Sequence, residues 1–255
     1  MRTQVRRSLM SFATAAVAAG IFVAASQTVG QAQGGAIVRT SWDKKPDFNG
    51  IWQAINTANW DLEDHNGARS PVVAAGNWLS IPPGMGVVEG GPIPYKPEAL
   101  VQREKNRKAA LTGNVGYDET RDPEANCYLP GIPRATYMNY PFQIFQSPGR
   151  MWMVYGFSYA RREIHLLPKP VEAPIEFWMG TSNGRWEGDT LVIDVTGNIA
   201  DTWFDRAGNF HTDELKVTER YTMIDKDHLN YEATIEDPNV FTRPWKISMP
   251  LYRRI

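Results

Sequence analysis

The stretch from Asp205 to Thr222, DRAGNFHTDELKVTERYT, gathers side chains that could exchange protons. A histidine that titrates near neutrality, beside a partly desolvated acid and a tyrosine, is suited to general acid–base catalysis at pH 7. The candidate catalytic residues are His211, Glu219, Asp213, Tyr221 and Asp205.

Glu219 lies on the apolar face of the strand that this stretch predicts. Side chains alternate between the two faces of a strand, so Glu219 shares its face with Val217 and Tyr221. A carboxylate on a core face is costly unless it is ion-paired, hydrogen-bonded or protonated. Two interpretations stay open: Glu219 pairs structurally with an arginine such as Arg162 or Arg243, or it serves chemistry.

Aromatic side chains near these acids could wall a site for a flat or apolar molecule. The candidate ligand-binding residues are Trp52, Trp203, Phe210 and Arg206. A pocket with aromatic walls and a polar end formed by His211, Glu219 and Tyr221 suits ligand binding. The same pocket would also suit a cofactor-independent lyase, hydratase, isomerase or hydrolase. Because no catalytic motif is present, we favour binding of an aromatic or apolar small molecule, with the enzyme as the alternative.

Other chemistries find little support in the sequence. Four histidines occur without a metal-ligand spacing, so no metal is predicted, although a site that joins His165, His211 and a carboxylate from separate strands stays open. Cys127 is the only cysteine and has no histidine close in sequence. Nucleophile-elbow and nucleotide-binding glycine motifs are absent, which predicts no cofactor. A net charge of -1, from 27 basic and 28 acidic residues, argues against a nucleic-acid partner.

The N-terminus has the pattern of a secretory signal peptide. Arginines precede the apolar run from Leu9 to Ala25, and cleavage after Ala25 or Ala32 satisfies the small-residue rule. The pair Arg6 and Arg7 weakly resembles a twin-arginine export signal. We predict a signal peptide over 1–32 and a single domain over 33–255, which is periplasmic or secreted and not inserted in the membrane after processing. The oligomeric state stays open.

The rest of the chain alternates like a meander of β-strands. Pro97 at a helix start predicts one surface helix over 98–111, and residues 54–97 predict a long loop. Turn residues separate the predicted strands 142–146, 151–159, 162–167, 176–179, 190–195, 215–222, 229–235 and 246–252. This pattern predicts a mainly β protein with one antiparallel β-barrel or strongly curled sheet, closed by the helix and the loop; a two-sheet sandwich is the alternative.

Two resemblances accompany this interpretation. The segment DFNGIW at 47–52 resembles the Gly-x-Trp start of lipocalin-type barrels, in which the tryptophan plugs one end. The blocks PDFNGIW, CYLPGIPRATYM, GRWEGDTLVIDVTG, DRAGNFHTDELKVTERY and DHLNYEATIEDPNVFTRPW resemble a family of exported bacterial proteins of unknown function. The family resemblance implies export and assigns no activity, cofactor or catalytic residue.

Overall fold

The computed structural model describes residues 35–69, 80–110 and 122–254. The predicted signal peptide and its cleavage sites lie outside these residues. The helical segments are α2 (Pro97–Ala110), the 3-10 helix η3 (Pro123–Asn126) and α3 (Arg134–Tyr137). The strands are β1 (Gly50–Ala54), β2 (Asp64–His65), β3 (Gly84–Met85), β4 (Phe142–Ser147), β5 (Arg150–Tyr155), β6 (Arg161–His165), β7 (Thr181–Glu187), β8 (Thr190–Thr196), β9 (Lys216–Asp225), β10 (His228–Glu236) and β11 (Trp245–Arg254).

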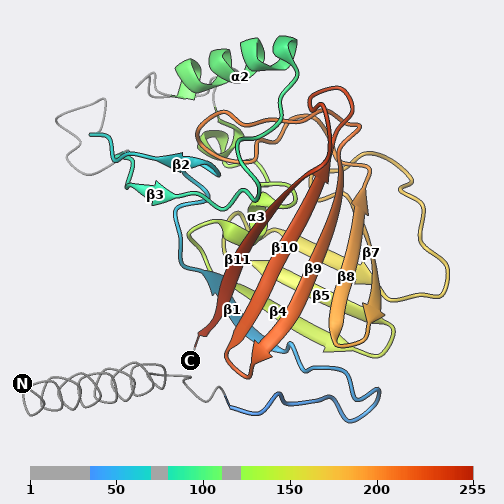
Figure 1. Cartoon of the computed structure of the whole chain (residues 1–255). Coiled ribbons are helices and arrows are strands. Elements are labelled where there is room, and N and C mark those ends of the chain that lie inside the picture. Colours follow the sequence, from blue (N-terminus) through green and yellow to red (C-terminus); the bar gives the residue numbers. More distant parts are fainter. Residues whose placement is uncertain (1–34, 70–79, 111–121, 255) are drawn as a thin grey trace, which may run out of the picture. The chain divides into compact units, whose positions relative to one another are not determined.

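Nine strands form a closed barrel in the order β1-β11-β10-β9-β8-β7-β6-β5-β4, and β2 pairs with β3 in a separate two-stranded sheet (Figure 1). The predicted β-barrel is therefore confirmed. The prediction of a wholly antiparallel sheet is wrong at one seam, where β6 and β7 pair in parallel through Ile164 with Ser182 and His165 with Asn183. Residues 166–180 return along the barrel, so β7 starts at the same end as β6.

The helix starts at Pro97 as predicted, and most strands lie within a few residues of their predicted bounds. The strand predicted at 176–179 is wrong: Phe177 makes only an isolated bridge with Asn198, and the strand is β7 instead. The pair Asn183-Gly184 has the sequence of a turn. In the structure Gly184 lies inside β7, where a Cβ would come within 2.7 Å of the side chains of Ile164 and Leu166. The glycine is required there by close packing between strands.

The long strands β9 and β10 alternate as their sequences predict. On β9, Val217, Glu219 and Tyr221 are buried and the residues between them are half-buried. Glu219 pairs in register with Ala233 of β10. Apolar side chains of all nine barrel strands enter one core, and Glu219 points into it with no exposed surface. The interior position predicted for Glu219 is therefore what the structure shows.

The two ends of the barrel strands are covered differently. At the end that carries the β9–β10 turn, Trp52 is fully buried, donates its indole N–H to the carbonyl of Phe48 at 2.8 Å, and has the guanidinium of Arg253 4.3 Å from its ring centroid. Arg253 in turn donates to the carbonyl of Lys226 in that turn. The opposite strand ends carry the long connections 55–141 and 197–215 (Figure 1).

None of the helices described is long and apolar enough to cross a membrane.

Candidate functional site

A polar cluster occupies the interior of the barrel, and we call it the barrel cluster. Its members are Arg162, Ser182, Glu219, Tyr221 and Tyr231, which come from β6, β7, β9 and β10. The guanidinium of Arg162 reaches across from β6 and forms a short ion pair with Glu219 Oε2. Both side chains are at most 1% exposed. A structural arginine partner for Glu219, one of the two interpretations from the sequence, is therefore observed.

The remaining contacts of Glu219 are hydroxyl groups. Tyr231 donates to Glu219 Oε1 at 2.8 Å and Tyr221 donates to the same oxygen at 3.1 Å. The hydroxyl of Thr136, on α3, lies 3.3 Å from that of Tyr221. Glu219 thus has three donors from three strands, as a buried carboxylate requires.

Arg162 is less completely satisfied than Glu219. Its Nε donates to Ser182 Oγ at 2.7 Å and its Nη2 donates to Glu219. Its Nη1 is buried and has no acceptor in ideal geometry, but the Tyr155 hydroxyl lies close enough to the guanidinium for a hydrogen bond with Arg162 to lower the pKa of that phenol. The hydroxyl of nearby Tyr155 donates at 3.4 Å to the sulfur of Met153. The barrel interior therefore holds a buried ion pair surrounded by tyrosine hydroxyls.

Burial keeps the tyrosines around this ion pair protonated. It raises the pKa of Tyr221 and Tyr231 well above the usual value, and the negative charge of Glu219 raises both further. Burial likewise raises the pKa of Tyr155, although Arg162 acts in the opposite direction. These phenols act as neutral hydrogen-bond donors and not as bases at pH 7.

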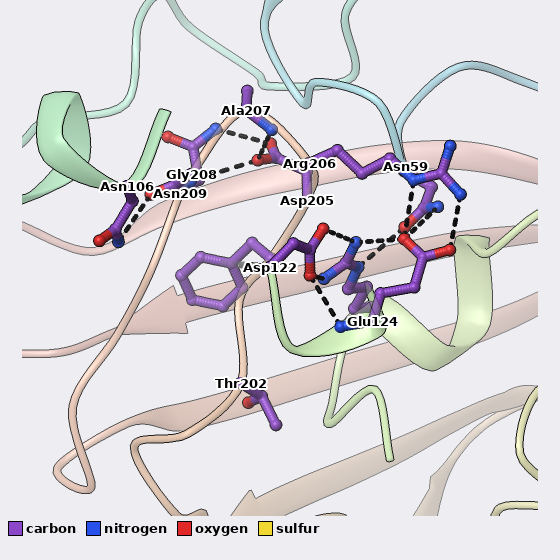
Figure 2. A network of polar contacts seen from close by, with 12 residues as sticks. Asn59, Asn106, Asp122, Glu124, Thr202, Asp205, Arg206, Ala207, Gly208 and Asn209 are labelled. Atoms are coloured by element: carbon purple, nitrogen blue, oxygen red, sulfur yellow. Dashed lines mark hydrogen bonds and ion pairs between the residues drawn. The ribbon is translucent and has the colours of Figure 1, made fainter. Parts of the chain in front are cut away.

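A second polar cluster joins the long connections, and we call it the loop network; Figure 2 shows most of it. At its centre the buried Arg134 of α3 binds Asp122 through two hydrogen bonds of 2.7 and 2.8 Å. Arg134 also donates to Glu124 at 2.7 Å and to Asn59 at 2.8 Å. Arg206 binds the other side of Glu124 through hydrogen bonds of 2.6 and 2.8 Å. Five side chains from four segments thus form one continuous network.

Electrostatics in the loop network favour the charged forms. Burial lowers the pKa of Arg134, but Asp122 and Glu124 raise it and outweigh burial, so the group stays charged. Burial raises the pKa of Glu124, and hydrogen bonds from Arg206 together with the charge of Arg134 lower it below the usual value. Pairing between these arginines and carboxylates therefore keeps the buried groups charged.

Asp205 anchors the adjoining turn of the loop network. Its carboxylate accepts from the backbone N–H groups of Leu62, Ala207 and Asn209, and from the side-chain amide of Asn209 at 2.6 Å. Burial raises the pKa of Asp205 to about 7, and the nearby carboxylate of Asp61 adds to this. These hydrogen bonds of Asp205 hold the 55–62 segment against the 205–209 turn.

Asn209 extends this turn to α2. Its side-chain oxygen accepts from Tyr95 at 2.9 Å and from Arg103 of α2 at 3.0 Å. Asn106 of α2 donates to the carbonyl of Gly208 at 3.3 Å, where a Cβ on that glycine would come within 2.6 Å of the helix backbone. Because α2 buries only Ala99 and Asn106, polar contacts hold the helix in place. The DRAGN part of the opening stretch is the attachment point for these loops.

The predicted catalytic residues do not form one group. Tyr221 contacts Glu219, as expected. His211 binds Thr202 at 2.7 Å and the carbonyl of Thr212 at 2.8 Å, and it shares no partner with Glu219. Burial lowers the pKa of His211, which keeps its ring neutral. Asp213 is exposed and Asp205 belongs to the loop network, so the predicted convergence on Glu219 is limited to Tyr221.

The predicted aromatic walls are also separated. Trp52 lies at the end of the barrel that carries the β9–β10 turn, whereas Trp203 lies in the connection before β9. Trp203 is half-buried and forms an antiparallel bridge with Phe210, which stacks on Tyr95. Arg206 serves the loop network and lies over the ring of Trp60. These residues do not line a common site with Glu219.

The histidines give no sign of a metal centre. His165 lies 3.8 Å from Glu163 on the half-exposed outer side of β6, and His211 has the partners given above. Across residues 35–69, 80–110 and 122–254, no group of three or more histidine, cysteine or acidic side chains could hold a metal ion.

Sequence reasoning missed several members of both clusters. Tyr231 was recognisable, because it lies on the inward face of β10 and a barrel brings such faces together. Ser182 was hidden because β7 was not predicted. Arg134, Asp122 and Glu124 come from irregular segments, where periodicity says nothing about which side chains meet.

A surface cavity of about 330 Å³ lies beside the start of β11. It is lined by Glu89, Gly90, Thr234, Arg243, Pro244, Trp245 and Lys246. Lys246 there is already paired with Glu89 and Glu232 at 2.8 Å each. This hollow contains neither of the two clusters.

No family model, curated protein or solved structure matches this chain. The resemblance of its sequence blocks to a family of exported bacterial proteins therefore stays a prediction.

Proposed function

We propose that the protein binds a small aromatic or apolar molecule inside the barrel, with the barrel cluster as the polar end of the site. The observation that carries this proposal is the barrel cluster itself, an ion pair of Arg162 and Glu219 with tyrosine hydroxyls inside an otherwise apolar barrel. Buried ion pairs are often no more stabilising than apolar side chains of similar volume, so a polar cluster in a barrel core points to a role beyond stability. A ligand with one polar group would direct that group to the cluster and pack its apolar part against the barrel core.

Aromatic and sulfur-containing side chains around Arg162 suit such a ligand. Tyr155, Tyr221 and Met153 are buried beside the guanidinium, and the Tyr155 hydroxyl lies 3.4 Å from the Met153 sulfur. A flat or apolar molecule packs favourably against phenol rings and a thioether. Methionine is also flexible enough to make room for a guest.

Binding fits the geometry better than acid–base catalysis. A general base must have a free lone pair within reach of the proton that it takes. Glu219 is held by a guanidinium and two phenols, and His211 is held by Thr202 and Thr212. Among the described residues the two groups have separate partners, so they do not form a hydrogen-bonded acid–base pair.

We further propose that the protein acts outside the cytoplasm. Its support is the sequence pattern of arginines, apolar run and small residues before residue 33. Mass spectrometry of the exported protein is expected to show an N-terminus between residues 26 and 36. Intact Met1 in the membrane fraction would contradict this.

Methionine-methyl NMR tests binding inside the barrel. Met153 is fully buried beside Tyr155 and Tyr221, whereas Met85 is 96% exposed and serves as the control. In the purified protein labelled at methionine methyls, acetophenone or ethylbenzene is expected to shift the Met153 resonance, assigned with Met153→Leu, and to leave Met85 in place. If neither molecule shifts Met153 at saturating concentration, or if both shift only exposed methionines, binding inside the barrel is refuted.

A further inference from the structure

We infer that the turn between β5 and β6, residues 157–160, docks the protein on a lipid surface, with Tyr159 as the side chain that enters the headgroup layer. This turn lies outside the barrel interior, so the inference does not rest on ligand binding there. Three observations carry it: the backbone of the turn, the rigid support beneath it and the exposed side chains beside it.

The turn at 157–160 has a backbone conformation that its sequence disfavours. The N–H of Ala160 donates to the carbonyl of Phe157 at 3.1 Å, and the φ angles of Ser158 and Tyr159 between them are 50° and 51°. Two left-handed residues closed by such a bond form a type I′ turn, for which asparagine and glycine are the usual central residues. The Cβ atoms of other residues are crowded in that conformation. Tyr159 is therefore an unfavourable choice for forming the turn.

Two other hairpin turns of the barrel meet the same kind of demand with glycine. Gly149, between β4 and β5, has a φ angle of 78°, and Gly188, between β7 and β8, has a φ angle of 62°. Tyr159 gains little from packing in return, because it is 87% exposed. A local rule broken without a gain in packing is typical of a functional surface.

The turn is held firmly from below. The hydroxyl of Ser158 donates to the carbonyl of Cys127 at 3.1 Å, and the N–H of Gly156 donates to the carbonyl of Pro141 at 3.0 Å. These bonds tie the turn to two separate segments of the chain. Because Tyr159 is presented by a fixed backbone, a contact made by its ring requires little further ordering of the protein.

The side chains beside Tyr159 suit lipid headgroups. The ring of Tyr140 lies 5.7 Å from that of Phe157, centroid to centroid, and Tyr140 is 46% exposed. Arg161 is exposed, and it forms no ion pair with the described residues. Tyrosines favour membrane interfaces, where the ring is in an apolar layer and the hydroxyl stays hydrated. A free guanidinium is suited to binding the phosphate of a headgroup.

A lipid surface fits these residues better than a protein partner does. Tyr159, Tyr140 and Arg161 lie on and beside a turn, away from the surface cavity beside β11. Stable protein interfaces use roughly 20–30 residues from each side. Headgroups, in contrast, rearrange around a single inserted ring, and weak contacts of this kind add to one another. A symmetric contact with a second copy would also bring two unpaired arginines together.

The native Cys127 allows the contact to be detected at the turn itself. It is the only cysteine of the chain, it is exposed, and its carbonyl is bonded to Ser158. A nitrobenzoxadiazole label on this thiol in the full chain is expected to emit more strongly and at shorter wavelength when phosphatidylcholine vesicles are added. Vesicles that also contain phosphatidylglycerol are expected to act at lower lipid concentration, because Arg161 then meets anionic headgroups.

Two results with the labelled protein would overturn the inference. One is an emission spectrum that neither kind of vesicle changes. The other is an emission change that appears without lipid as the protein concentration rises, which would assign the surface to a second copy of the chain. Lipid contact made by the apolar run from Leu9 to Ala25 does not imitate the expected result, because the label reports on the turn.

Tyr159→Gly separates the role of the ring from the stability of the turn. This variant is expected to need roughly ten-fold more lipid for half of the emission change, because one ring no longer leaves water. Its melting temperature is expected to rise, because glycine fits the left-handed backbone. Phe145→Ala is the matched control, since Phe145 is 46% exposed on β4 and is expected to leave the lipid titration unchanged.

The two variants can also contradict the assignment to the turn. An unchanged lipid titration in Tyr159→Gly, or an equal loss in Phe145→Ala, would place the contact elsewhere. A lower melting temperature in Tyr159→Gly would show that the tyrosine serves folding.

Discussion

The barrel cluster and the loop network are both buried sets of ions, and they differ in how completely their hydrogen bonds are satisfied. In the loop network, Arg134 reaches three partners and the carboxylates of Asp122 and Glu124 face cations. In the barrel cluster, Nη1 of Arg162 has no acceptor in ideal geometry, and the Tyr155 hydroxyl is its neighbour there. The loop network is explained by the folding of the loops, whereas the barrel cluster places ions in a core that apolar side chains of similar volume fill equally well.

The first way to test this comparison is to break the loop network, where we expect the largest loss of stability. Arg134→Met leaves Asp122 buried without its cation and Glu124 with Arg206 alone. Removing one partner from a buried ion pair costs about 4 kcal/mol of unfolding free energy. Urea denaturation measures this, and a loss smaller than about 1 kcal/mol would show that the network does not hold the loops in place.

The barrel cluster is expected to respond almost as strongly. Glu219→Gln leaves the guanidinium of Arg162 buried without a counter-charge, so we expect a loss of about 3 kcal/mol or more in unfolding free energy. Replacing both partners, as in Arg162→Met with Glu219→Leu, is expected to restore much of this loss, because apolar side chains of similar volume often replace buried ion pairs well. A double variant no more stable than Glu219→Gln would contradict the assignment of the loss to an unpaired charge.

Asp205 is expected to impose a pH dependence on the loop network. Because burial raises its folded-state pKa to about 7, above the unfolded value, its stabilising contribution is present in acid and is lost as the pH rises from about 4 to about 7. The slope reaches about 1.4 kcal/mol per pH unit for one proton. His211 acts in the opposite direction, since its lowered pKa removes stability as the pH falls.

Comparison with Asp205→Asn separates these two contributions. The variant keeps His211 and is expected to lose the decline in stability with rising pH over that range. Unfolding free energies measured at several pH values for both proteins provide the check. Identical slopes would show that Asp205 does not take up a proton in the folded protein.

A surface ion pair provides the smallest expected effect. Arg39 binds Asp189 at 2.8 Å, with both side chains more than 40% exposed. Solvent screens such pairs, so Arg39→Met is expected to leave the melting temperature unchanged. If Arg39→Met lowered the melting temperature as much as Arg134→Met does, burial would not explain why the two clusters stabilise the protein more than a surface ion pair does.

The strands show how far sequence reasoning reached. Alternation placed Glu219 and Tyr221 on the inward face of β9, and the arginine partner was among the alternatives, because both conclusions follow from local periodicity and the cost of a buried charge. Gly184 shows the limit: only its contacts with β6 reveal why a glycine belongs inside a strand. Asn209 and Arg134 show a second limit, since irregular segments brought them to partners far away in the sequence.

Two residues of the predicted site, His211 and Glu219, have different partners for the same physical reason. His211 and Glu219 are close in sequence, but a connection and the start of a strand can turn their side chains to different partners. Proximity along the chain correctly predicted the contact between Tyr221 and Glu219, because alternate residues of one strand share a face. It carried no information across the turn that precedes the strand.

Crystals of the protein grown with 4-bromoacetophenone test the central claim most directly, because the bromine can be located by its anomalous scattering. The account predicts a bromine peak inside the barrel, beside the barrel cluster. A bromine peak confined to the surface cavity beside β11, with an unchanged barrel interior, would contradict it.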